Sequence, residues 1–404
     1  MTKLDALPPL ALYVHIPWCV RKCPYCDFNS HEREGRLPES EYVGKLMLDL
    51  ESLLPAVWGR RLVAVFIGGG TPSLFSPEAI DALLSGVRAR LPLEPGAEVT
   101  LEANPGTVEA ARFRGFREAG VNRISIGVQS FDDRMLGALG RIHGSDEARR
   151  AIAAAAASFD NINIDLMYGL PGQTMAMARA DIEEAARSGV PHVSAYQLTL
   201  EPNTVFWSRP PQLPEHDLCA DMQVVIEETL KNAGYEHYET SAFARPGRRC
   251  AHNLNYWEFG DYLGIGAGAH GKISFADRIT RHERAKQPRE YLQMNNTVAD
   301  ERTVSVEELP FEFMLNALRL VGGFPLRLFE ERTGLPLTIL EKKLQTAEQA
   351  GLLERDWKRV RPTVRGQRFL NELLGLFLSG ETPGRAPDAP GAGRVIRISS
   401  PASR

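Results

Sequence analysis

Three cysteines near the start of the chain have a spacing that suits a metal cluster. Cys19, Cys23 and Cys26 follow one another as C-x3-C-x2-C. Three thiolates on one loop can each bind a different iron of a 4Fe-4S cluster and leave the fourth iron open to another ligand. A zinc site completed by His15 or His31 is the alternative, but zinc ribbons favour paired C-x2-C knuckles, and this chain has no second pair. The spacing therefore favours the cluster.

Composition limits the remaining choices. The chain has 404 residues, of which 43% are hydrophobic and 24% charged, enough for one large core and a second, smaller one. Its net charge of -4 and pI near 6.2 give no bulk attraction to nucleic acid, which is not expected as a partner. The first twelve residues resemble neither a secretory signal nor a membrane span, so a cytoplasmic protein is predicted. The odd cysteine count argues against a disulfide framework, and Cys219 and Cys250 are expected to be ordinary thiols.

Short β-branched runs alternate with segments of helical periodicity, which predicts repeated strand–helix units around a parallel sheet. Sequence alone leaves open whether such a sheet stays open or curls into a complete or partial barrel. The predicted strands lie near residues 12–15, 62–67, 98–102, 123–128, 161–167 and 192–200, and the predicted helices at 37–54, 77–91, 108–119, 145–158, 174–188 and 215–233.

Residues able to do chemistry come just after these strands. The cysteines follow the first strand, a Gly68-Gly69-Gly70-Thr71 run follows the second, and Glu102, Gln129 and Asp165 end later ones. Loops at the carboxyl ends of parallel strands converge on one face, so these residues are expected to meet there. The glycine run lacks the Lys-Ser/Thr ending of a phosphate-binding loop; it either lets the backbone approach a ligand or forms a structural turn.

The pattern changes near residue 304. Helical segments at 311–321, 326–332, 338–350 and 365–377 surround a short hairpin at 352–361, which predicts a helix-rich, winged-helix-like domain. The last stretch is rich in Pro, Gly, Ser and Arg and is expected to be disordered. The predicted division is a barrel domain over residues 1–300, a C-terminal domain over 301–379 and a tail over 380–404.

Several motifs in order resemble the radical-S-adenosylmethionine proteins related to oxygen-independent coproporphyrinogen dehydrogenase. The resemblance extends from Leu12 to about Phe377 and implies an α/β fold with a partial (β/α)6 barrel, a 4Fe-4S cluster and S-adenosylmethionine. Its segments are Tyr13-Val14-His15-Ile16-Pro17-Trp18-Cys19 through Phe28, Phe66 to Ser73, Glu102-Ala103-Asn104-Pro105-Gly106, Ser125 to Phe131, Leu139-Gly140-Arg141-Ile142-His143 and Asn163 to Pro171.

The resemblance also implies roles for individual residues. Tyr13 and Tyr25 would flank S-adenosylmethionine, and Gly70 and Thr71 would contact it by backbone. Its polar groups would be bound by Glu102, Gln129, Arg141 and Asp165. A carboxylate such as Asp165 suits ribose hydroxyls, and a guanidinium such as that of Arg141 suits a carboxylate.

Two departures separate the chain from the dehydrogenase itself. Phe28 stands where the dehydrogenase is expected to have a fourth cysteine. The cysteine loop of this chain also begins close to the N-terminus. A block around residues 250–271 instead resembles haem chaperones of the same family. His252 is a competent iron ligand, Tyr256 and Trp257 offer flat apolar area, and a core histidine between aromatic neighbours is the plainer alternative.

The expected function is therefore that of a haem chaperone, which passes haem to respiratory membrane proteins as the resemblance implies. A coproporphyrinogen dehydrogenase, another true radical enzyme and a plain binding module with a structural cluster stay open as alternatives. Whether S-adenosylmethionine is cleaved, whether the chain forms a homodimer and whether it meets the inner membrane during transfer are also open.

Overall fold

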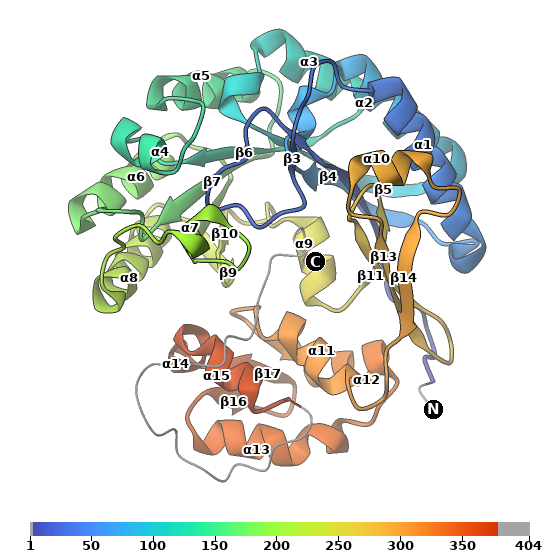
Figure 1. The fold of residues 1–404 in the computed structure, drawn as a ribbon. Helices are drawn as coiled ribbons and strands as arrows, with labels where there is room; N and C mark the ends of the chain where they lie inside the picture. Colours follow the sequence, from blue (N-terminus) through green and yellow to red (C-terminus); the bar gives the residue numbers. More distant parts are fainter. Residues whose placement is uncertain (1–2, 379–404) are drawn as a thin grey trace.

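A long curved sheet organises the computed structural model, which describes residues 3–378 (Figure 1). Within these residues the main sheet has twelve strands in the order β14-β13-β12-β11-β1-β4-β5-β6-β7-β8-β10-β9. Neighbours from β11 to β8 run parallel, as the alternation of strands and helices predicts. These parallel strands are β1 (Leu10–Ile16), β4 (Leu62–Gly69), β5 (Leu93–Ala103), β6 (Arg123–Gln129), β7 (Ile162–Tyr168), β8 (His192–Gln197) and β11 (Asp261–Ile265).

Helices cover the outer face of the strands, while α9 lies on the inner side of the arc (Figure 1). Each helix predicted between strands is present within two residues of its predicted ends. The short α4, α7, α9 and α10 were not predicted. The helices are α1 (Glu39–Leu53), α2 (Pro77–Arg90), α3 (Ala110–Ala119), α4 (Asp133–Ala138), α5 (Ser145–Ala156), α6 (Met175–Arg187), α7 (Val205–Ser208), α8 (His216–Asn232), α9 (Ala251–Trp257) and α10 (Pro288–Gln293).

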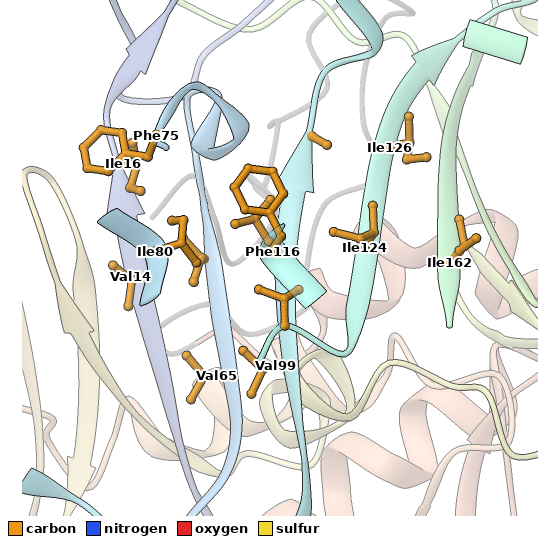
Figure 2. Packing of buried hydrophobic residues seen from close by; sticks show 14 of the residues in the cluster. Val14, Ile16, Val65, Phe75, Ile80, Val99, Phe116, Ile124, Ile126 and Ile162 are labelled. Carbon is orange, nitrogen blue, oxygen red and sulfur yellow. The ribbon is translucent and has the colours of Figure 1, made fainter. Parts of the chain in front are cut away.

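Alternation along each strand decides which side chains face the helices. Successive residues of a strand point to opposite faces of the sheet. Val14, Val65, Val99 and Ile124 lie in one buried layer with side chains of the outer helices, such as Ile80 (Figure 2). The residues between them on the strands therefore face inward, and many of these are polar.

Antiparallel strands extend the sheet at both ends, and the sequence reading did not predict them as strands. They are short or mixed in composition, so their alternation is weak. They are β9 (Glu236–Glu239), β10 (Ala242–Ala244), β12 (His270–Ser274), β13 (Ile279–Arg284) and β14 (Val298–Thr303). The sheet ends in the edge strands β14 and β9, so the barrel is partial.

The C-terminal segment has a hydrophobic core of its own, centred on Phe313, Phe324 and Phe329. Phe259 and Ile279 of the preceding segment join this core. The hairpin and the first three predicted helices are present, whereas the helix predicted over 365–377 is divided at Phe369 into two short helices. The elements of this segment are α11 (Leu309–Ala317), β15 (Phe324–Pro325), α12 (Leu326–Thr333), α13 (Glu341–Gln349), β16 (Leu353–Arg355), β17 (Arg359–Pro362), α14 (Val364–Arg368) and α15 (Leu370–Gly375).

Two further expectations concern the ends of the chain and the membrane. The expected tail over residues 380–404 lies outside the described residues. Across residues 3–378 no helix combines the length and apolar character that crossing a membrane requires.

Candidate cluster and cofactor site

The cysteine loop leaves the sheet at the carboxyl end of β1 and is closed at its base by a small two-stranded sheet. In that sheet β2 (Trp18–Cys19) pairs with β3 (His31–Glu32), and the Arg33 N–H donates to the Cys19 carbonyl at 2.9 Å. The thiols of Cys19, Cys23 and Cys26 are all partly exposed, whereas Cys219 and Cys250 are buried. The loop therefore presents three thiols together at the mouth of the barrel.

Each of these thiols has a polar partner from the protein. The Thr71 hydroxyl donates to Cys19 Sγ at 3.5 Å, and Arg141 Nη1 donates to Cys23 Sγ at 3.6 Å. Cys26 Sγ lies 3.7 Å from the Ser30 hydroxyl. Hydrogen bonds to sulfur and a nearby cation favour thiolates, which are the form that binds iron. Here they oppose burial, which raises the pKa of Cys19 and raises that of Cys26 to about 11. The donor set fits an iron–sulfur cluster.

The zinc alternative finds no support in this geometry. Among residues 3–378 no three His, Cys, Asp or Glu side chains converge closely enough to hold a single metal ion. In a cubane each thiolate binds a different iron, so the three sulfurs need not converge on one point. His15, one of the two proposed fourth ligands, bonds instead to the Asn29 carbonyl and the Tyr13 hydroxyl, at 2.9 and 3.0 Å.

The glycine run after β4 is explained by contacts within the chain. Gly69 has φ near +114°, and a Cβ there would lie 2.7 Å from the His15 ring. A Cβ on Gly70 would lie 2.6 Å from the Trp18 carbonyl oxygen. The chain itself makes the close approach, as expected for a structural turn. A backbone contact between Gly70 or Thr71 and S-adenosylmethionine stays a prediction.

Below the cysteine loop, inward-facing side chains enclose a polar cavity. Its enclosed space is about 50 Å³, room for a few water molecules. Its lining residues come from β1, β4 to β8 and α9; they are Tyr13, Phe66, Glu102, Arg123, Ser125, Asn163, Asp165, Ser194, Tyr196, His252 and Asn253.

Glu102 and Asp165 both line this cavity. Glu102 lies near the end of β5, as predicted, whereas Asp165 lies in the middle of β7 because this strand continues to Tyr168. Glu102 Oε2 accepts the Gly69 N–H at 3.1 Å, and burial together with the charge of Asp165 raises the pKa of Glu102 to about 8. Asp165 accepts from the Ser125 hydroxyl at 3.0 Å and from Asn163 Nδ2 at 2.8 Å. Burial also raises the pKa of Asp165. Two buried carboxylates side by side suit a ligand with hydroxyl or ammonium groups.

Three other residues expected around S-adenosylmethionine do not line this cavity: Arg141, Gln129 and Tyr25. Arg141 Nη2 donates to the Gly127 carbonyl at 2.8 Å, and its buried Nε has no partner among the described residues. Gln129 ends β6 with φ near +70°, a strained conformation for a residue other than glycine, next to a bulge in the β6–β7 pairing. Tyr25 packs 6.3 Å from the Phe206 ring, outside the cavity lining.

The segment expected to bind haem is buried. The ring of His252 stacks on Phe66 at 4.9 Å and meets the edge of Tyr256 at 4.8 Å. Tyr256 packs 4.1 Å from Tyr262, and the guanidinium of Arg319 covers Trp257 at 4.4 Å. The aromatic rings thus face the core and not an open surface. Their role toward haem stays a prediction.

His252 nevertheless lines the cavity. Its Nδ1 has no hydrogen-bond partner within the described residues. Burial, and then the charge of Arg123, lower the pKa of His252 to about 3, so the imidazole is neutral. A neutral imidazole is the form that binds iron. The structure therefore brings His252 to the same cavity as Glu102 and Asp165.

Several lining residues were missed from the sequence. Ser125, Asn163 and Ser194 occupy alternate positions with Ile124, Ile164 and Val193, and only this period of two marks them as inward-facing. They are linked: Asn163 Nδ2 donates to Ser125, and the Ser194 hydroxyl donates to Asn163 Oδ1. Polar residues at every second position of a buried strand were the available signal.

Comparison with protein families assigns both parts of the chain. The model described as "Radical SAM superfamily" matches residues 13–185, which include the cysteine loop, Glu102 and Asp165. The model described as "HemN C-terminal domain" matches residues 304–369.

Curated relatives match almost end to end. The Escherichia coli K12 protein named "Heme chaperone HemW" is 50% identical over 92% of this chain and 99% of its own length. The Haemophilus influenzae protein of the same name is 48% identical over 94% of this chain and 100% of its own. A Bos taurus protein, "Radical S-adenosyl methionine domain-containing protein 1, mitochondrial", is 36% identical over 91% of this chain.

A solved structure shares the fold. The structure titled "Coproporphyrinogen III oxidase (HemN) from Escherichia coli is a Radical SAM enzyme" superposes with a TM-score of 0.78 over 92% of this chain and 90% of its own, at 23% identity. At that identity the likeness concerns the fold alone. The end-to-end identity to curated relatives carries the assignment: the chain belongs to the radical SAM superfamily and, within it, to the HemW family of heme chaperones.

Proposed function

We propose that this protein is a haem chaperone that binds haem and delivers it to respiratory membrane proteins. The observation that carries the proposal is its 50% identity to a protein named "Heme chaperone HemW" over 99% of that protein's length. The work of a chaperone is to hold its cargo and then release it to a better site.

In this proposal Cys19, Cys23 and Cys26 hold a 4Fe-4S cluster at the mouth of the barrel. Thr71 and Arg141 support the proposal because their donors lie within 3.6 Å of two of these sulfurs. The cluster, when bound, supplies an open iron for the amino and carboxylate groups of S-adenosylmethionine. Glu102 and Asp165 bind the polar groups of that cofactor from β5 and β7. Tyr13, Gly70 and Gln129 border it, and Tyr25 of the cysteine loop flanks it.

His252 is the proposed iron ligand for haem. What supports it is a neutral imidazole with an unpartnered Nδ1 on the cavity wall. Tyr256 and Trp257 then act by fixing the helix and the imidazole, since they pack beneath it in the core. Transfer takes place in the cytoplasm or at the inner membrane, where the acceptors are, with one chain or a homodimer as the transferring unit.

The alternative, oxygen-independent coproporphyrinogen dehydrogenase, is the weaker candidate. Its support is a fold shared with a structure that is 23% identical in sequence. Against it, Phe28 stands where that enzyme is expected to have a fourth cysteine.

One experiment separates the two functions. Anaerobically reconstituted protein is incubated with haem and, separately, with coproporphyrinogen and S-adenosylmethionine. We expect a tight haem complex by absorption spectroscopy and no decarboxylated product. The His252→Ala variant should lose haem affinity but keep its cluster spectrum, whereas His216→Ala, at an exposed position on α8, should match the wild type. Catalytic turnover of coproporphyrinogen would overturn the proposal, and undiminished haem binding by a folded His252→Ala variant would move the iron ligand elsewhere.

A further inference from the structure

Two buried hydroxyl groups lie against the sulfurs of the cysteine loop. Thr71 Oγ1 donates to Cys19 Sγ at 3.5 Å, and Ser30 Oγ lies 3.7 Å from Cys26 Sγ. Only 6% of Thr71 and 3% of Ser30 are exposed, whereas the cysteines are half-buried. A thiolate has no proton of its own, so Ser30 is the donor once Cys26 binds iron. Both hydroxyl protons are thus directed at sulfur.

The glycine turn after β4 fixes the position of Thr71. The Gly70 N–H donates to the Ile16 carbonyl and the Thr71 N–H donates to the Trp18 carbonyl, both at 2.8 Å. A Cβ on Gly70 would lie 2.6 Å from the Trp18 carbonyl oxygen, so glycine permits this close approach. The turn is therefore bonded to the strand that leads into the cysteine loop, and it holds the Thr71 hydroxyl beside Cys19.

Ser30 is held from the other side of the loop. It directly precedes His31, whose N–H donates to the Pro17 carbonyl at 2.7 Å and which begins β3, the strand that pairs with β2. Burial raises the pKa of Cys19, and the hydroxyls of Thr71 and Ser30 both act to lower it. The Ser30 hydroxyl therefore acts on Cys19 as well as on its nearer sulfur.

We propose that Ser30 and Thr71 raise the reduction potential of the cluster through hydrogen bonds to its cysteine sulfurs. The inference rests on the proposed cluster at Cys19, Cys23 and Cys26. One electron from an external donor makes a 4Fe-4S cluster more negative, and hydrogen bonds to the sulfurs are one of the factors that set its potential. A donor stabilises the more negative, reduced form to a greater extent. Burial of the two hydroxyls strengthens the effect, because water does not compete with them.

The two hydroxyls can be changed separately from the contacts expected with S-adenosylmethionine. Arg141 also donates to a sulfur, Cys23 Sγ at 3.6 Å, but the resemblance assigns its guanidinium to that cofactor as well. Thr71 is expected to contact the cofactor through its backbone, which Thr71→Val keeps. Ser30 is not among the residues that the resemblance assigns to the cofactor. Substitution of these two side chains therefore tests the environment of the sulfurs.

The test measures the potential of the anaerobically reconstituted full chain without S-adenosylmethionine. The cluster is titrated with dithionite and redox mediators, and the reduced form is followed by electron paramagnetic resonance. In Ser30→Ala/Thr71→Val the ratio of reduced to oxidised cluster at a fixed potential should fall about tenfold, which is ~59 mV toward more negative potential for one electron. Each single variant should give part of this shift.

Matched variants separate the effect of a donor from a general disturbance of the loop. Thr71→Ser and Ser30→Thr keep a hydroxyl and should have potentials close to that of the wild type. Ser73→Ala removes a buried hydroxyl of the same turn that bonds to the Thr107 hydroxyl at 2.8 Å, and it should leave the potential unchanged. Iron analysis confirms that each variant carries about four irons per chain before its potential is compared.

A second measurement needs no variant to fold. Resonance Raman spectra of the oxidised wild type are compared in H2O and D2O, and the iron–sulfur stretching bands should shift because donated hydroxyl protons exchange. The absence of any shift would overturn the proposal, as would an unchanged potential in both Ser30→Ala and Thr71→Val or an equal shift in Ser73→Ala. Failure of the wild type to assemble a cluster would instead refute the proposed cluster.

Discussion

The cysteine loop and helix α9 are built in opposite ways. The loop presents three half-buried cysteines, each with polar groups beside its sulfur, and is closed by two-residue strands. Helix α9 is capped by Glu98 and surrounded by aromatic rings, with His252, Tyr256 and Trp257 all buried. The first region is prepared to receive a group, whereas the second is already packed and offers one polar edge to the cavity.

This difference in construction allows one chain to provide two separate sites, one completed by its ligand and one formed before its ligand binds. A loop of thiols takes its rigidity from the cluster that it binds, since metal binding and local folding are coupled. A histidine held by packing stays neutral and oriented before its ligand arrives. Asn29 ties the cysteine loop to a third region, the segment after β11: its Nδ2 donates to the carbonyls of Ala267 and Lys286, both at 2.9 Å.

Removing a thiol should have the largest effect. Replacement of Cys19, Cys23 or Cys26 by Ala should abolish cluster assembly, because each thiolate binds a separate iron. Iron and sulfide analysis of reconstituted protein should fall from about four of each per chain to near zero. Cys219→Ala is the matched control and should keep its full content. Stoichiometric zinc without sulfide in freshly purified wild type would refute the cluster.

Trp257→Ala tests whether the aromatic side of α9 is core. Removing a buried tryptophan should lower the free energy of unfolding by about 3–5 kcal/mol, measured by urea denaturation with circular dichroism. Trp58, which is 88% exposed, provides the control, and Trp58→Ala should change stability by less than about 0.5 kcal/mol. Equal stability of the two variants would mean that Trp257 is not packed as described.

Asn29→Ala tests how the cysteine loop is attached to the rest of the barrel. It removes three side-chain hydrogen bonds and leaves carbonyl acceptors unpaired, so stability should fall by about 1–3 kcal/mol. The sharper readout is the rate at which a chelator extracts iron, which should rise because the loop loses its attachment to residues 267 and 286. Asn296→Ala, at an exposed position of the same segment, should leave the rate unchanged. A rate for Asn29→Ala equal to that of the wild type would show that this attachment does not hold the loop.

The smallest effect concerns pH. The pKa of Glu102 is about 8 in the folded protein against an ordinary value of 4.5. The folded state thus keeps a proton that the unfolded chain releases between these values, so the stability of the cluster-free protein should fall as pH rises from about 4.5 to about 8. Glu102→Gln cannot ionise and should become progressively more stable than the wild type across this window. Denaturation at several pH values measures the difference, and a constant difference would contradict it.

Much of this organisation was predictable from sequence. The remaining features were not predictable, for physical reasons. The parallel strands and their helices follow from clear periodicity, and the cysteines from local spacing. Arg123 and Asn163 lie far apart in the chain and meet only because of the strand order β6-β7, so no local pattern assigns them to one cavity. The aromatic residues of α9 form the same sequence pattern whether they face a ligand or the core. The role of the glycines after β4 was likewise ambiguous from sequence, because His15 and Trp18 lie against them only in the folded chain.

Haem transfer tests the central claim most directly. Reconstituted protein loaded with one haem is mixed with a haem-free respiratory membrane protein in detergent, and the acceptor's absorption spectrum is followed over time. The account predicts that the acceptor gains haem from the loaded protein faster than from an equal amount of free haem, and that Cys23→Ala, which lacks the cluster, loses this advantage. A rate no greater than that of free haem, or haem retained on the loaded protein, would contradict it.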